Sequence, residues 1–307
     1  MSRYIIRRLI LMVVSVFIVI TITFFLMHSI PGGPFSTDRA LPVEVEEAIN
    51  EKYNLNEPVY VQYFDYLKKI AKFDFGPSMK YQSISVNDLI ASGLPISAKL
   101  GLGASVIILV GIPLGIVAAL KRNSIIDRGI LIFTTIGRVV PSFVLATIML
   151  YYFSIKNNWL PTFGLDSLKS YIMPIISIAA ASLASISRLT RSCMLDVLDQ
   201  DYIRTAQSKG LKRNRIIIVH ALRNSMIPVV TQLAYIITAL LTGSFVIERI
   251  FAIPGLGRQF VDTISNRDYT AIMGLTILVA IIMVVTTFSI DMLYMLIDPR
   301  IKLNEKS

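Results

Sequence analysis

The residues of this chain that could carry out chemistry are few and far apart in the sequence. Its 307 residues include two histidines, His28 and His220, and a single cysteine, Cys193. Residues scattered in this way do not match the ligand spacing of a zinc site, and no Ser–His–Asp arrangement is indicated. The phosphate-binding pattern GxxxxGK followed by Ser or Thr is also absent from the sequence. We therefore expect no catalytic residue, no metal site and no ATP hydrolysis by this chain.

Charge is concentrated in one segment, residues 201–228, which lies between two long apolar stretches. Its sequence, DYIRTAQSKGLKRNRIIIVHALRNSMIP, predicts two short helices that are broken at Gly210. The side chains around the break are basic and the next four are apolar, so we expect the segment to lie at a membrane surface and then re-enter an apolar environment. The basic residues are Lys209, Lys212, Arg213 and Arg215, and the apolar residues are Ile216, Ile217, Ile218 and Val219.

The first of these two helices has recognisable boundaries. We expect Asp201 to be its N-cap and Tyr202 its first residue. Gly210 is expected to take the left-handed conformation that ends the helix, with Leu211 folding back toward Ala206 as in a Schellman cap. Because Ala206 and Gly210 stand one turn apart, one side of the helix is nearly bare of side chains and would let another backbone approach closely.

The composition indicates an integral membrane protein. Apolar residues make up 54% of the chain, charged residues only 16%, and the mean hydropathy is +0.65, whereas a soluble domain has about 25% charged residues. The chain has a net charge of +10. An excess of Lys and Arg is typical of membrane proteins, in which basic residues hold loops on the cytoplasmic side. We expect no nucleic-acid partner, because basic and aromatic residues are not interleaved.

Six apolar stretches have about the 20 residues that a helix needs to cross a bilayer. The first follows Arg3, Arg7 and Arg8 and is too long for the apolar core of a cleaved signal peptide, so we expect it to be retained. The sequence thus predicts an all-α integral membrane protein with six transmembrane helices and a small helical extracytoplasmic segment between the first two. The six stretches are residues 9–34, 96–120, 129–155, 171–186, 226–247 and 271–296.

The charges between these stretches predict the orientation of the chain. The loops after the second and fourth stretches are rich in Lys and Arg, which indicates the cytoplasmic side, so both termini are expected to be cytoplasmic. The predicted divisions are a cytoplasmic N-terminal tail with the first span at 1–30, an extracytoplasmic helical segment at 31–95, a core of five spans at 96–298 that contains the loop 201–228, and a cytoplasmic C-terminal tail at 299–307.

The extracytoplasmic segment is expected to form a small packed cap rather than a ligand site. Pro42 opens an acidic helix, and Pro58 opens a second helix with one apolar stripe. The acidic residues are Glu44, Glu46, Glu47 and Glu51, and the stripe consists of Tyr60, Tyr63, Phe64, Leu67 and Ile70.

Small residues and prolines punctuate the predicted spans. Gly111 and Gly115 are one turn apart and allow close contact with another helix. Pro113 and Pro141 are expected to kink their helices. We interpret these four residues as structural features of helix packing rather than as functional residues.

Arg138 and Asp291 are ionisable residues inside predicted spans. Arg138 lies about 14 Å along the helix from Gly129, at 1.5 Å per residue, a depth at which a charge requires a partner or water. One hypothesis is that Arg138 and Asp291 pair, or that both border the inner mouth of a pathway. The alternative is that Arg138 extends alone to the inner surface.

The loop from Glu248 to Gly257 is rich in Gly and Pro, which predicts a re-entrant or tightly turned segment. It is either an external turn or part of an outer gate, and we favour the gate. The residues that we expect along a translocation pathway or at its gates are Arg138, Pro141, Asp291, Pro254 and Gly255.

The segment 201–228 resembles a known motif. Arg204-Thr-Ala-x-x-Lys-Gly-Leu, followed by Ile217, His220-Ala-Leu-Arg-Asn and Pro228, is similar to the EAA loop of ABC-importer permease subunits. In that family the loop forms a coupling helix that sits in a cleft of the ATP-binding subunit. Arg204 and Thr205 replace the acidic residue and first alanine of the general pattern, as in the peptide and nickel branch. The resemblance assigns coupling to Arg204, Thr205, Ala206, Lys209, Gly210, Leu211, Arg213, His220 and Asn224.

Two further stretches resemble the same branch. Asn56-x-Pro, Gln62-Tyr-x-x-Tyr-Leu and Phe73-Asp-Phe-Gly-x-Ser together are similar to the external segment of the first, B-type, permease subunit of oligopeptide, dipeptide and nickel importers. Glu248-Arg-Ile-Phe-x-x-Pro-Gly-Leu-Gly also resembles the family. The resemblance therefore covers nearly the full chain.

The resemblance implies ATP-driven import of oligopeptides or dipeptides across a bacterial cytoplasmic (inner) membrane. The implied partners are a second homologous permease subunit, two ATP-binding subunits that carry ATP and magnesium, an extracytoplasmic substrate-binding protein and membrane lipid. No cofactor is expected on this chain. Nickel or another small solute remains open as the cargo, because in this family the binding protein largely sets the specificity.

Two other classes of membrane protein remain open. An ion-coupled secondary transporter would need acidic residues and broken helices in paired repeats, and no repeat is visible in the sequence. A structural or assembly protein would need no coupling helix. A requirement for ATP and for a separate ATPase distinguishes all three classes.

Overall fold

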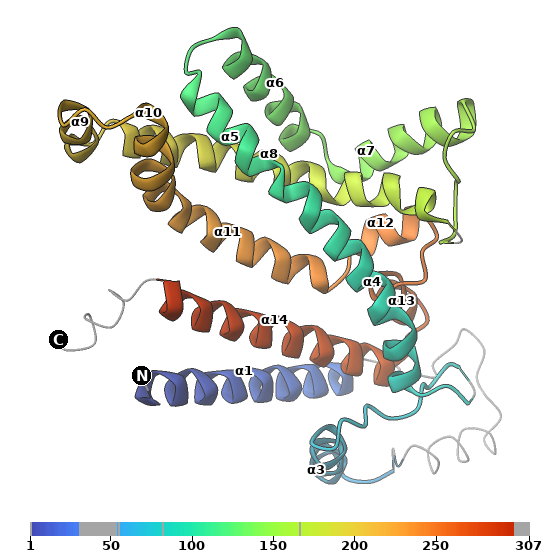
Figure 1. Ribbon diagram of the computed structural model, residues 1–307. Helices are drawn as coiled ribbons and strands as arrows, with labels where there is room; N and C mark the ends of the chain where they lie inside the picture. Colours follow the sequence, from blue (N-terminus) through green and yellow to red (C-terminus); the bar gives the residue numbers. More distant parts are fainter. Residues whose placement is uncertain (1, 31–53, 55, 82, 166, 298–307) are drawn as a thin grey trace. The chain divides into compact units, whose positions relative to one another are not determined.

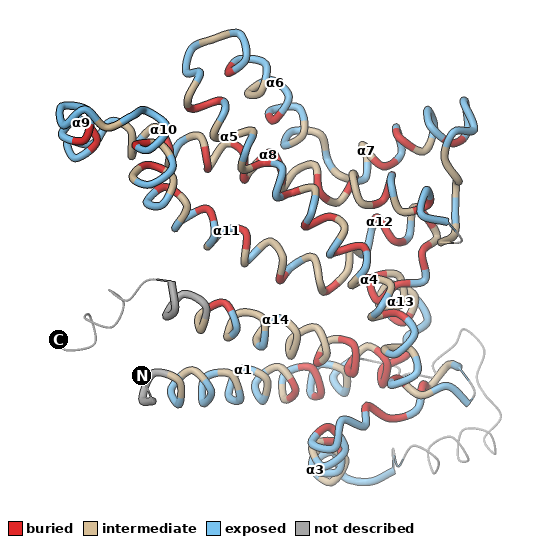
Figure 2. Tube along the Cα trace, viewed as in Figure 1, coloured by how far each residue is buried: buried red, intermediate tan, exposed pale blue. Residues whose placement is uncertain are grey.

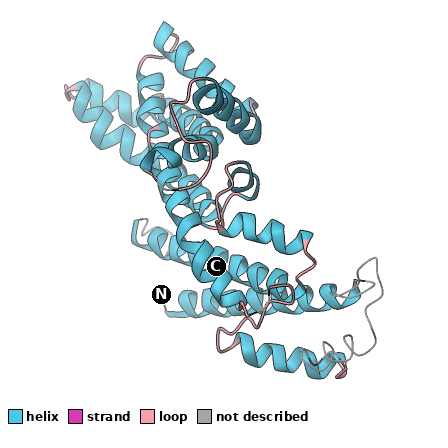
Figure 3. Cartoon of the chain, turned by 90° about the vertical axis from the view of Figure 1, so that its right-hand side faces the viewer, coloured by secondary structure: helices cyan, strands magenta, loops and turns pink. Residues whose placement is uncertain are grey.

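The computed structural model describes residues 2–30, 54, 56–81, 83–165 and 167–297 (Figure 1). Within these residues the chain is helical, and the only extended pairing is an isolated bridge between Pro77 and Ser85. Figure 3 accordingly draws helices joined by loops. The predicted all-α fold is confirmed. The predicted acidic helix after Pro42 lies outside the described residues.

Five helices of the described chain are long and apolar enough to cross a membrane. They are Ile5–Ser29, Val86–Leu120, Leu168–Leu198, Arg213–Ile250 and Tyr269–Met292. A sixth candidate is the pair Ile125–Val139 and Ser142–Lys156, which is bent by 99° at a short break. The predicted count of six spans holds if this bent pair is taken as one span.

The bent pair corrects the expected kink at Pro141. Helix α6 (Ile125–Val139) ends and α7 (Ser142–Met149) begins around Pro141, so the predicted span 129–155 is two helices rather than one kinked helix. The reason is local: a residue before proline is driven out of the helical region, and Val140 is extended, with φ −73° and ψ 118°. Near Pro113 the helix assignment is divided at Val110, between α4 and α5, but Val110 keeps helical dihedrals (φ −62°, ψ −23°). The kink expected at Pro113 stays a prediction.

The chain folds as two compact units, which we describe separately. The first contains the described residues up to Leu94 and those from Gln259 to Phe288, and the second contains the described residues of Pro95–Arg258 and of Ser289–Pro299. Helix α4 (Val86–Leu109) therefore begins in the first unit and continues in the second.

The first unit is built from α1 (Ser2–Ser29), α3 (Val59–Ile70), the start of α4, and most of α13 (Leu256–Ser265) and α14 (Tyr269–Ile297). Its core joins the C-terminal half of α1 to α3 and to the beginning of α14. The buried residues of this core are Ile20, Phe24, Tyr66, Ile70, Phe75, Val86, Ala271, Met273 and Ile277.

Helix α3 confirms the helix predicted after Pro58 but corrects its apolar stripe. Tyr66 and Ile70 are buried, with Tyr63 and Leu67 packed beside them. Tyr60 and Phe64, which belong to the predicted stripe, are 66% and 58% exposed. The buried face thus follows positions 63, 66, 67 and 70, a helical period that is offset from the one expected.

The second unit continues α4 and adds the elements up to Arg258. Before the third long helix these are α5 (Gly111–Leu120), α6, α7, the π-helix η1 (Leu150–Lys156) and the 3-10 turn η2 (Leu168–Tyr171). They are followed by α8 (Ile172–Leu198), α9 (Asp201–Ser208), α10 (Arg213–Arg215), the π-helix η3 (Ile216–Leu222), α11 (Arg223–Leu241) and α12 (Phe245–Ile250).

Helix α8 is the element on which the second unit is assembled. It contacts α5, α6, α7 and α11, and buried positions recur along its length (Figure 2). A Cβ atom at Gly111 would lie 2.8 Å from the carbonyl oxygen of Leu183, and one at Gly115 would lie 2.6 Å from the Cβ of Thr190. The close contact predicted for Gly111 and Gly115 is therefore confirmed.

Two helices extend beyond the apolar stretches that predicted them. Helix α8 continues to Leu198 instead of ending at Ile186. The second short helix that was expected after Gly210 begins at Arg213 and continues directly into the stretch predicted from Met226. The added turns contain charged residues, and hydropathy does not detect them. Both extensions lead to α9, the first helix of the segment 201–228.

Candidate functional site

Helix α9 occupies the place predicted for a short surface helix, with one correction at its start. The N-cap is Gln200, whose backbone is extended (φ −76°, ψ 149°) and whose side chain makes no capping hydrogen bond. Asp201 is the first residue of the helix rather than its N-cap. Its carboxylate lies in the first turn, where a negative charge is favoured by the helix dipole.

The end of α9 is the predicted Schellman cap. Gly210 has a φ of +76°. Its N–H donates to the carbonyl of Gln207 at 2.9 Å, and the N–H of Leu211 donates to the carbonyl of Ala206 at 3.3 Å. These are the two hydrogen bonds that define the motif. The sequence therefore fixes where the helix stops and how the chain leaves it.

The two small residues of α9 lie in different environments, contrary to the expectation of one bare outward face. Ile203 and Ala206 are 1% and 6% exposed and pack within this chain against Met194, Ile216 and Ala221. Gly210 faces open space, since a Cβ placed there would meet nothing within 4 Å. The close approach at Ala206 is thus made by the chain itself. The outward face is formed by Tyr202, Arg204, Thr205, Gln207, Ser208 and Lys209.

A side-chain hydrogen bond ties α9 to the next long helix. The Nδ2 of Asn224 donates to the Oη of Tyr202 at 3.0 Å and to the carbonyl of His220 at 3.1 Å. Asn224 is a predicted site residue that gains a physical role here, whereas Tyr202 was expected only as the helix start. His220 lies half-buried in the π-helix η3, and Arg213 is exposed in α10.

An ion pair with a buried carboxylate, which the sequence analysis missed, joins α6 to α8. The Nε and Nη2 atoms of Arg191 donate to Oδ1 and Oδ2 of Asp127, each at 2.7 Å. The Asp127 side chain is 2% exposed and that of Arg191 is 21% exposed. Asp127 also accepts from the N–H of Asn123 at 2.9 Å, and its own N–H donates to Ser124 Oγ at 3.3 Å. The pattern Ser124-x-x-Asp127 has the spacing of a capping box, which the sequence could have revealed, although the return hydrogen bond comes from the N–H of Asn123 rather than from that of Ser124.

The loop from Gly243 to Arg258 is organised around the carboxylate of Glu248, which is completely buried. Glu248 Oε1 accepts from Ser97 Oγ at 2.7 Å and from the N–H of Ser244 at 3.2 Å. Its Oε2 accepts from the N–H of Arg258 at 3.0 Å. We call this group of four residues the Glu248 clamp.

The two gate residues predicted in this loop differ in their exposure to solvent. Pro254 is exposed, whereas Gly255 is buried against Ser97 and Glu248. The N–H of Leu256 donates to Ser97 Oγ at 2.8 Å, so the turn after Pro254 is held by hydrogen bonds. The sequence predicted a tight turn here, but it did not indicate that Ser97 and Glu248 hold it.

For the remaining predicted pathway residues, the structure gives a position and an exposure but no contact that indicates a pathway. Arg138 lies in the last turn of α6, is exposed, and forms no ion pair with another described residue. Asp291 is half-buried on α14. Their pairing stays a prediction, as do the pathway roles of Arg138, Pro141 and Asp291.

In the first unit, Asp268 has a role that resembles that of Glu248. It is fully buried, accepts a short hydrogen bond from Ser78 Oγ, and accepts from the N–H of Met79 at 3.1 Å. The N–H of Ala271 also donates to it at 3.1 Å, so Asp268 caps the start of α14. The carboxylate therefore links the loop around Ser78, part of the motif Phe73-Asp-Phe-Gly-x-Ser, to α14.

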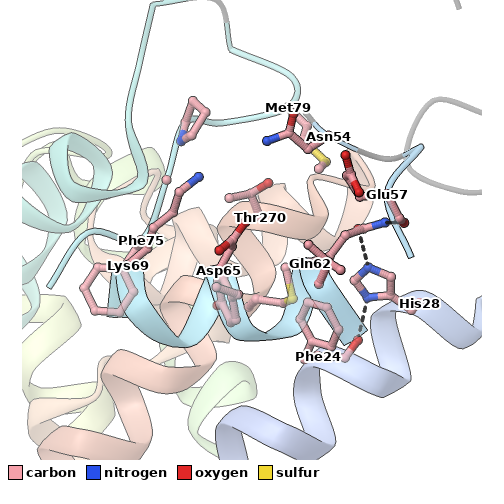
Figure 4. A pocket seen from close by; sticks show the side chains of 15 residues that line it. Phe24, His28, Asn54, Glu57, Gln62, Asp65, Lys69, Phe75, Met79 and Thr270 are labelled. Carbon is pink, nitrogen blue, oxygen red and sulfur yellow. Dashed lines mark hydrogen bonds between the residues drawn. The ribbon is translucent and has the colours of Figure 1, made fainter. Parts of the chain in front are cut away.

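A small pocket of about 150 Å³ lies in the first unit beside α3 (Figure 4). His28 stacks on Phe24 and bonds to its carbonyl oxygen at 2.8 Å and to Gln62 Oε1 at 3.1 Å. Burial raises the pKa of the neighbouring Tyr66 hydroxyl. His28 thus joins α1 to α3. Among the described residues, no group of three or more His, Cys, Asp and Glu could hold a metal ion.

Comparison with known proteins gives two family matches. Residues 111–303 match the family described as "Binding-protein-dependent transport system inner membrane component". Residues 1–84 match the N-terminal part of the membrane component of binding-protein-dependent transport systems.

Curated relatives match over the full chain. It is 44% identical over 307 residues to the dipeptide transport system permease protein DppB of Bacillus subtilis, with 100% of both chains covered. It is also 44% identical over 305 residues to the oligopeptide transport system permease protein OppB of Salmonella typhimurium, with 98% of this chain and 100% of the relative covered.

Solved structures of transporters share the fold. An inward-facing MetNI methionine ABC transporter matches with a TM-score of 0.54 at 16% identity, over 68% of this chain and 96% of that one. An amino acid ABC transporter matches with a TM-score of 0.52 at 20% identity, over 70% of this chain and 94% of that one.

Proposed function

Because the chain belongs to the family of inner-membrane components of binding-protein-dependent transport systems, we propose that it carries oligopeptides or dipeptides as the permease subunit of an ATP-driven importer. It is a multi-pass protein of the cytoplasmic membrane. The peptide cargo is supported by the full-length identity of 44% to permeases named for dipeptide and oligopeptide transport. Permeases of this family work with separate ATP-hydrolysing subunits.

The single observation that carries the coupling role is the construction of α9. One side of this helix is anchored by Ile203 and Ala206 in the chain's own core, and its end is fixed by the Schellman cap. The other side presents exposed polar side chains. A short helix that is anchored on one face and exposed on the other can bind a partner and move with it as a rigid body.

We assign contact with an ATP-binding subunit to one set of exposed residues, and support of α9 to the residues that pack beneath it or hydrogen-bond beside it. The exposed set is Arg204, Thr205, Lys209, Gly210 and Arg213, with Tyr202 added from the structure. The supporting set is Ala206, Leu211, His220 and Asn224.

The remaining partners follow the same proposal. A second homologous permease would complete the pathway, two ATP-binding subunits with ATP and magnesium would drive it, and an extracytoplasmic binding protein would deliver the peptide. Both termini and α9 would face the cytoplasm, where the ATP-binding subunits act. Arg138, Pro141 and Asp291 would border the pathway, and Pro254 and Gly255 would belong to its outer gate.

The coupling proposal is tested by reversing charge on the exposed face of α9. The double variant Arg204→Glu with Lys209→Glu changes exposed side chains and leaves the anchoring face intact. We expect co-purification of the ATP-binding subunit and peptide-stimulated ATP hydrolysis to fall by about tenfold or more, because reversing two charges on a contact face removes its electrostatic complementarity to the partner. Lys169→Glu, in the distant turn η2, is the matched control and should behave as wild type. Wild-type assembly and hydrolysis in the double variant would exclude α9 as the coupling surface.

The cargo is tested separately with the wild-type complex. Proteoliposomes that contain the permease pair and the ATP-binding subunits, supplied with the binding protein, should accumulate a labelled dipeptide or pentapeptide only when ATP is present inside. Accumulation of nickel instead of peptide would exclude the peptide assignment while leaving the transporter type intact. ATP-independent accumulation would instead favour an ion-coupled transporter.

A further inference from the structure

The clearest feature of the second unit that the coupling role does not use is the Glu248 clamp. A carboxylate removed from water is costly unless hydrogen bonds replace its hydration. Glu248 is completely buried, and in the part of the chain that the structure describes no Lys or Arg side chain forms an ion pair with it. Its charge is balanced by three donors, one hydroxyl and two backbone N–H groups. A carboxylate that holds three such donors fixes their relative positions.

The glycines of the loop are explained by this carboxylate. A Cβ at Gly255 would lie 2.6 Å from Ser97 Oγ, and one at Gly257 would lie 2.9 Å from both Glu248 Oε2 and the backbone nitrogen of Phe245. Gly243 has a φ of +89°, and a Cβ there would lie 2.9 Å from Glu248 Oε1. All three glycines give space to the Glu248 clamp. The loop is therefore a filled, hydrogen-bonded structure and not a flexible hinge.

The donors lie in the second unit, in or next to three separate helices. Ser97 lies on α4, Ser244 precedes α12, and Arg258 is in the first turn of α13. Ser97 Oγ both donates to Glu248 and accepts from Leu256 N–H, so it is shared between the carboxylate and the turn after Pro254. The contact between Ser97 and Glu248 joins residues that are 151 positions apart in the sequence.

We propose that Glu248 is a positioning residue for transport, whose carboxylate locks the loop 243–258 to α4 so that the outer gate moves with α4 as one rigid body. This inference rests on the proposed transport function. A gate that moves with a span opens only when the span moves. Loosening the Glu248 clamp would let the loop move by itself, and peptide movement would then lose its fixed relation to ATP hydrolysis.

The test compares Glu248→Gln with wild type in the reconstituted complex, and Glu57→Gln, a change on an exposed residue of the first unit, is the matched control. Gln keeps the shape but presents an NH₂ group to one of the N–H donors. We expect the peptide taken up per ATP hydrolysed to fall by about tenfold, with assembled complex still recovered. Ser97→Ala should change the same ratio in the same direction by less, and the double variant should be no worse than Glu248→Gln alone.

Amide hydrogen exchange supplies a second readout that does not depend on transport. The N–H groups of Leu256 and Arg258 donate to the Glu248 clamp, and their exchange should accelerate by about tenfold in Glu248→Gln. Unchanged exchange, or an unchanged ratio of peptide to ATP per assembled complex, would overturn the proposal. A variant that only reduces the amount of assembled complex would also overturn it, since that result indicates folding alone. If the wild-type complex shows no ATP-dependent uptake, the proposed function fails instead, and the exchange result still stands.

Discussion

Gly210 at the end of α9 and Gly255 in the loop before α13 are both glycines at turns, yet they are required for opposite reasons. Gly210 has a φ of +76° and nothing within 4 Å of the position that a Cβ would take. Gly255 has no such φ, but a Cβ there would lie 2.6 Å from Ser97 Oγ. The first glycine is needed for its backbone conformation, and the second is needed because the space is full.

The polar groups of the two regions differ in the same way. Around Gly255, the carboxylate of Glu248 and the hydroxyl of Ser97 are buried and hydrogen-bonded within the chain. Around Gly210, the polar side chains of α9 are exposed. Groups that are satisfied internally stabilise a fixed shape, whereas an exposed polar face is available to another protein. The comparison separates the part of the chain that must keep its own shape from the part that contacts a partner.

The largest effect is expected from filling the crowded glycine. Gly255→Ala would displace Glu248 or Ser97 and break hydrogen bonds of the Glu248 clamp, which we expect to cost about 2–3 kcal/mol of the free energy of unfolding. The measurement is the thermal unfolding midpoint of the purified complex. Gly129→Ala is the matched control, because a Cβ there meets nothing within 4 Å in a helical position, and it should be neutral or stabilising. Equal midpoints for the two variants would contradict the crowding argument.

A smaller loss of stability is expected from Asp127→Asn. This variant tests whether buried, internally paired polar groups also stabilise the fold outside the loop around Gly255. The pair with Arg191 is buried on the carboxylate side only, so we expect about 2 kcal/mol rather than the full cost of a buried broken pair. Adding Arg191→Gln should recover part of this loss, because the uncompensated charge is then removed. If the single variant has the same unfolding midpoint as wild type, the pair does not hold α6 to α8. Internal pairing of polar groups would then stabilise the loop around Gly255 but not the contact between α6 and α8.

Gly210→Ala should cost less still, about 1 kcal/mol, because alanine is strained at a left-handed φ but meets no neighbour. Gly210→Asn should be closer to wild type, since asparagine tolerates that conformation better. At Gly255 the order should reverse, with Asn worse than Ala. Stimulated ATP hydrolysis and the unfolding midpoint of all four variants provide the measurement. The same order at both positions would refute the distinction between conformation and space.

Features set by neighbours in the sequence were predictable, and those set by distant residues were not. The Schellman cap depends on Gly210, the four residues before it and Leu211 after it, and it was predicted correctly. The bend at Pro141 was expected, but its size depends on the extended conformation of Val140. The contacts of Glu248 with Ser97 and of Arg191 with Asp127 join residues 151 and 64 positions apart, and no local pattern indicates them.

The burial of α3 and α9 shows a second limit. Both helices were correctly expected, but Tyr60 and Phe64 are exposed although they belong to the predicted apolar stripe. Ala206 is buried although it was expected on an outward face. The buried face of a short helix outside the spans is decided by the neighbours that the fold places against it, and apolar side chains are common on protein surfaces, so hydrophobicity alone does not determine which face is inside.

The smallest change in stability is expected from Tyr202→Phe, which removes only the hydroxyl that accepts from Asn224. Asn224 keeps its bond to the carbonyl of His220 and is exposed to water, so we expect about 0.5 kcal/mol. Coupling should be affected more than stability, because this is the side-chain hydrogen bond that links the exposed face of α9 to α11. We therefore expect peptide-stimulated ATP hydrolysis to fall while the unfolding midpoint stays close to that of wild type.

Asn224→Ala should reproduce the effect of Tyr202→Phe, and the double variant should be no worse than Asn224→Ala, since both changes remove one interaction. Additive losses would mean that the two residues act separately. If Tyr202→Phe leaves hydrolysis unchanged, motion of α9 must pass through Ile203 and Ala206 alone, the apolar side that packs in the chain's own core. In that case the exposed face would serve only to bind the partner, and the buried face would transmit the force, which divides the two roles of this helix between its two sides.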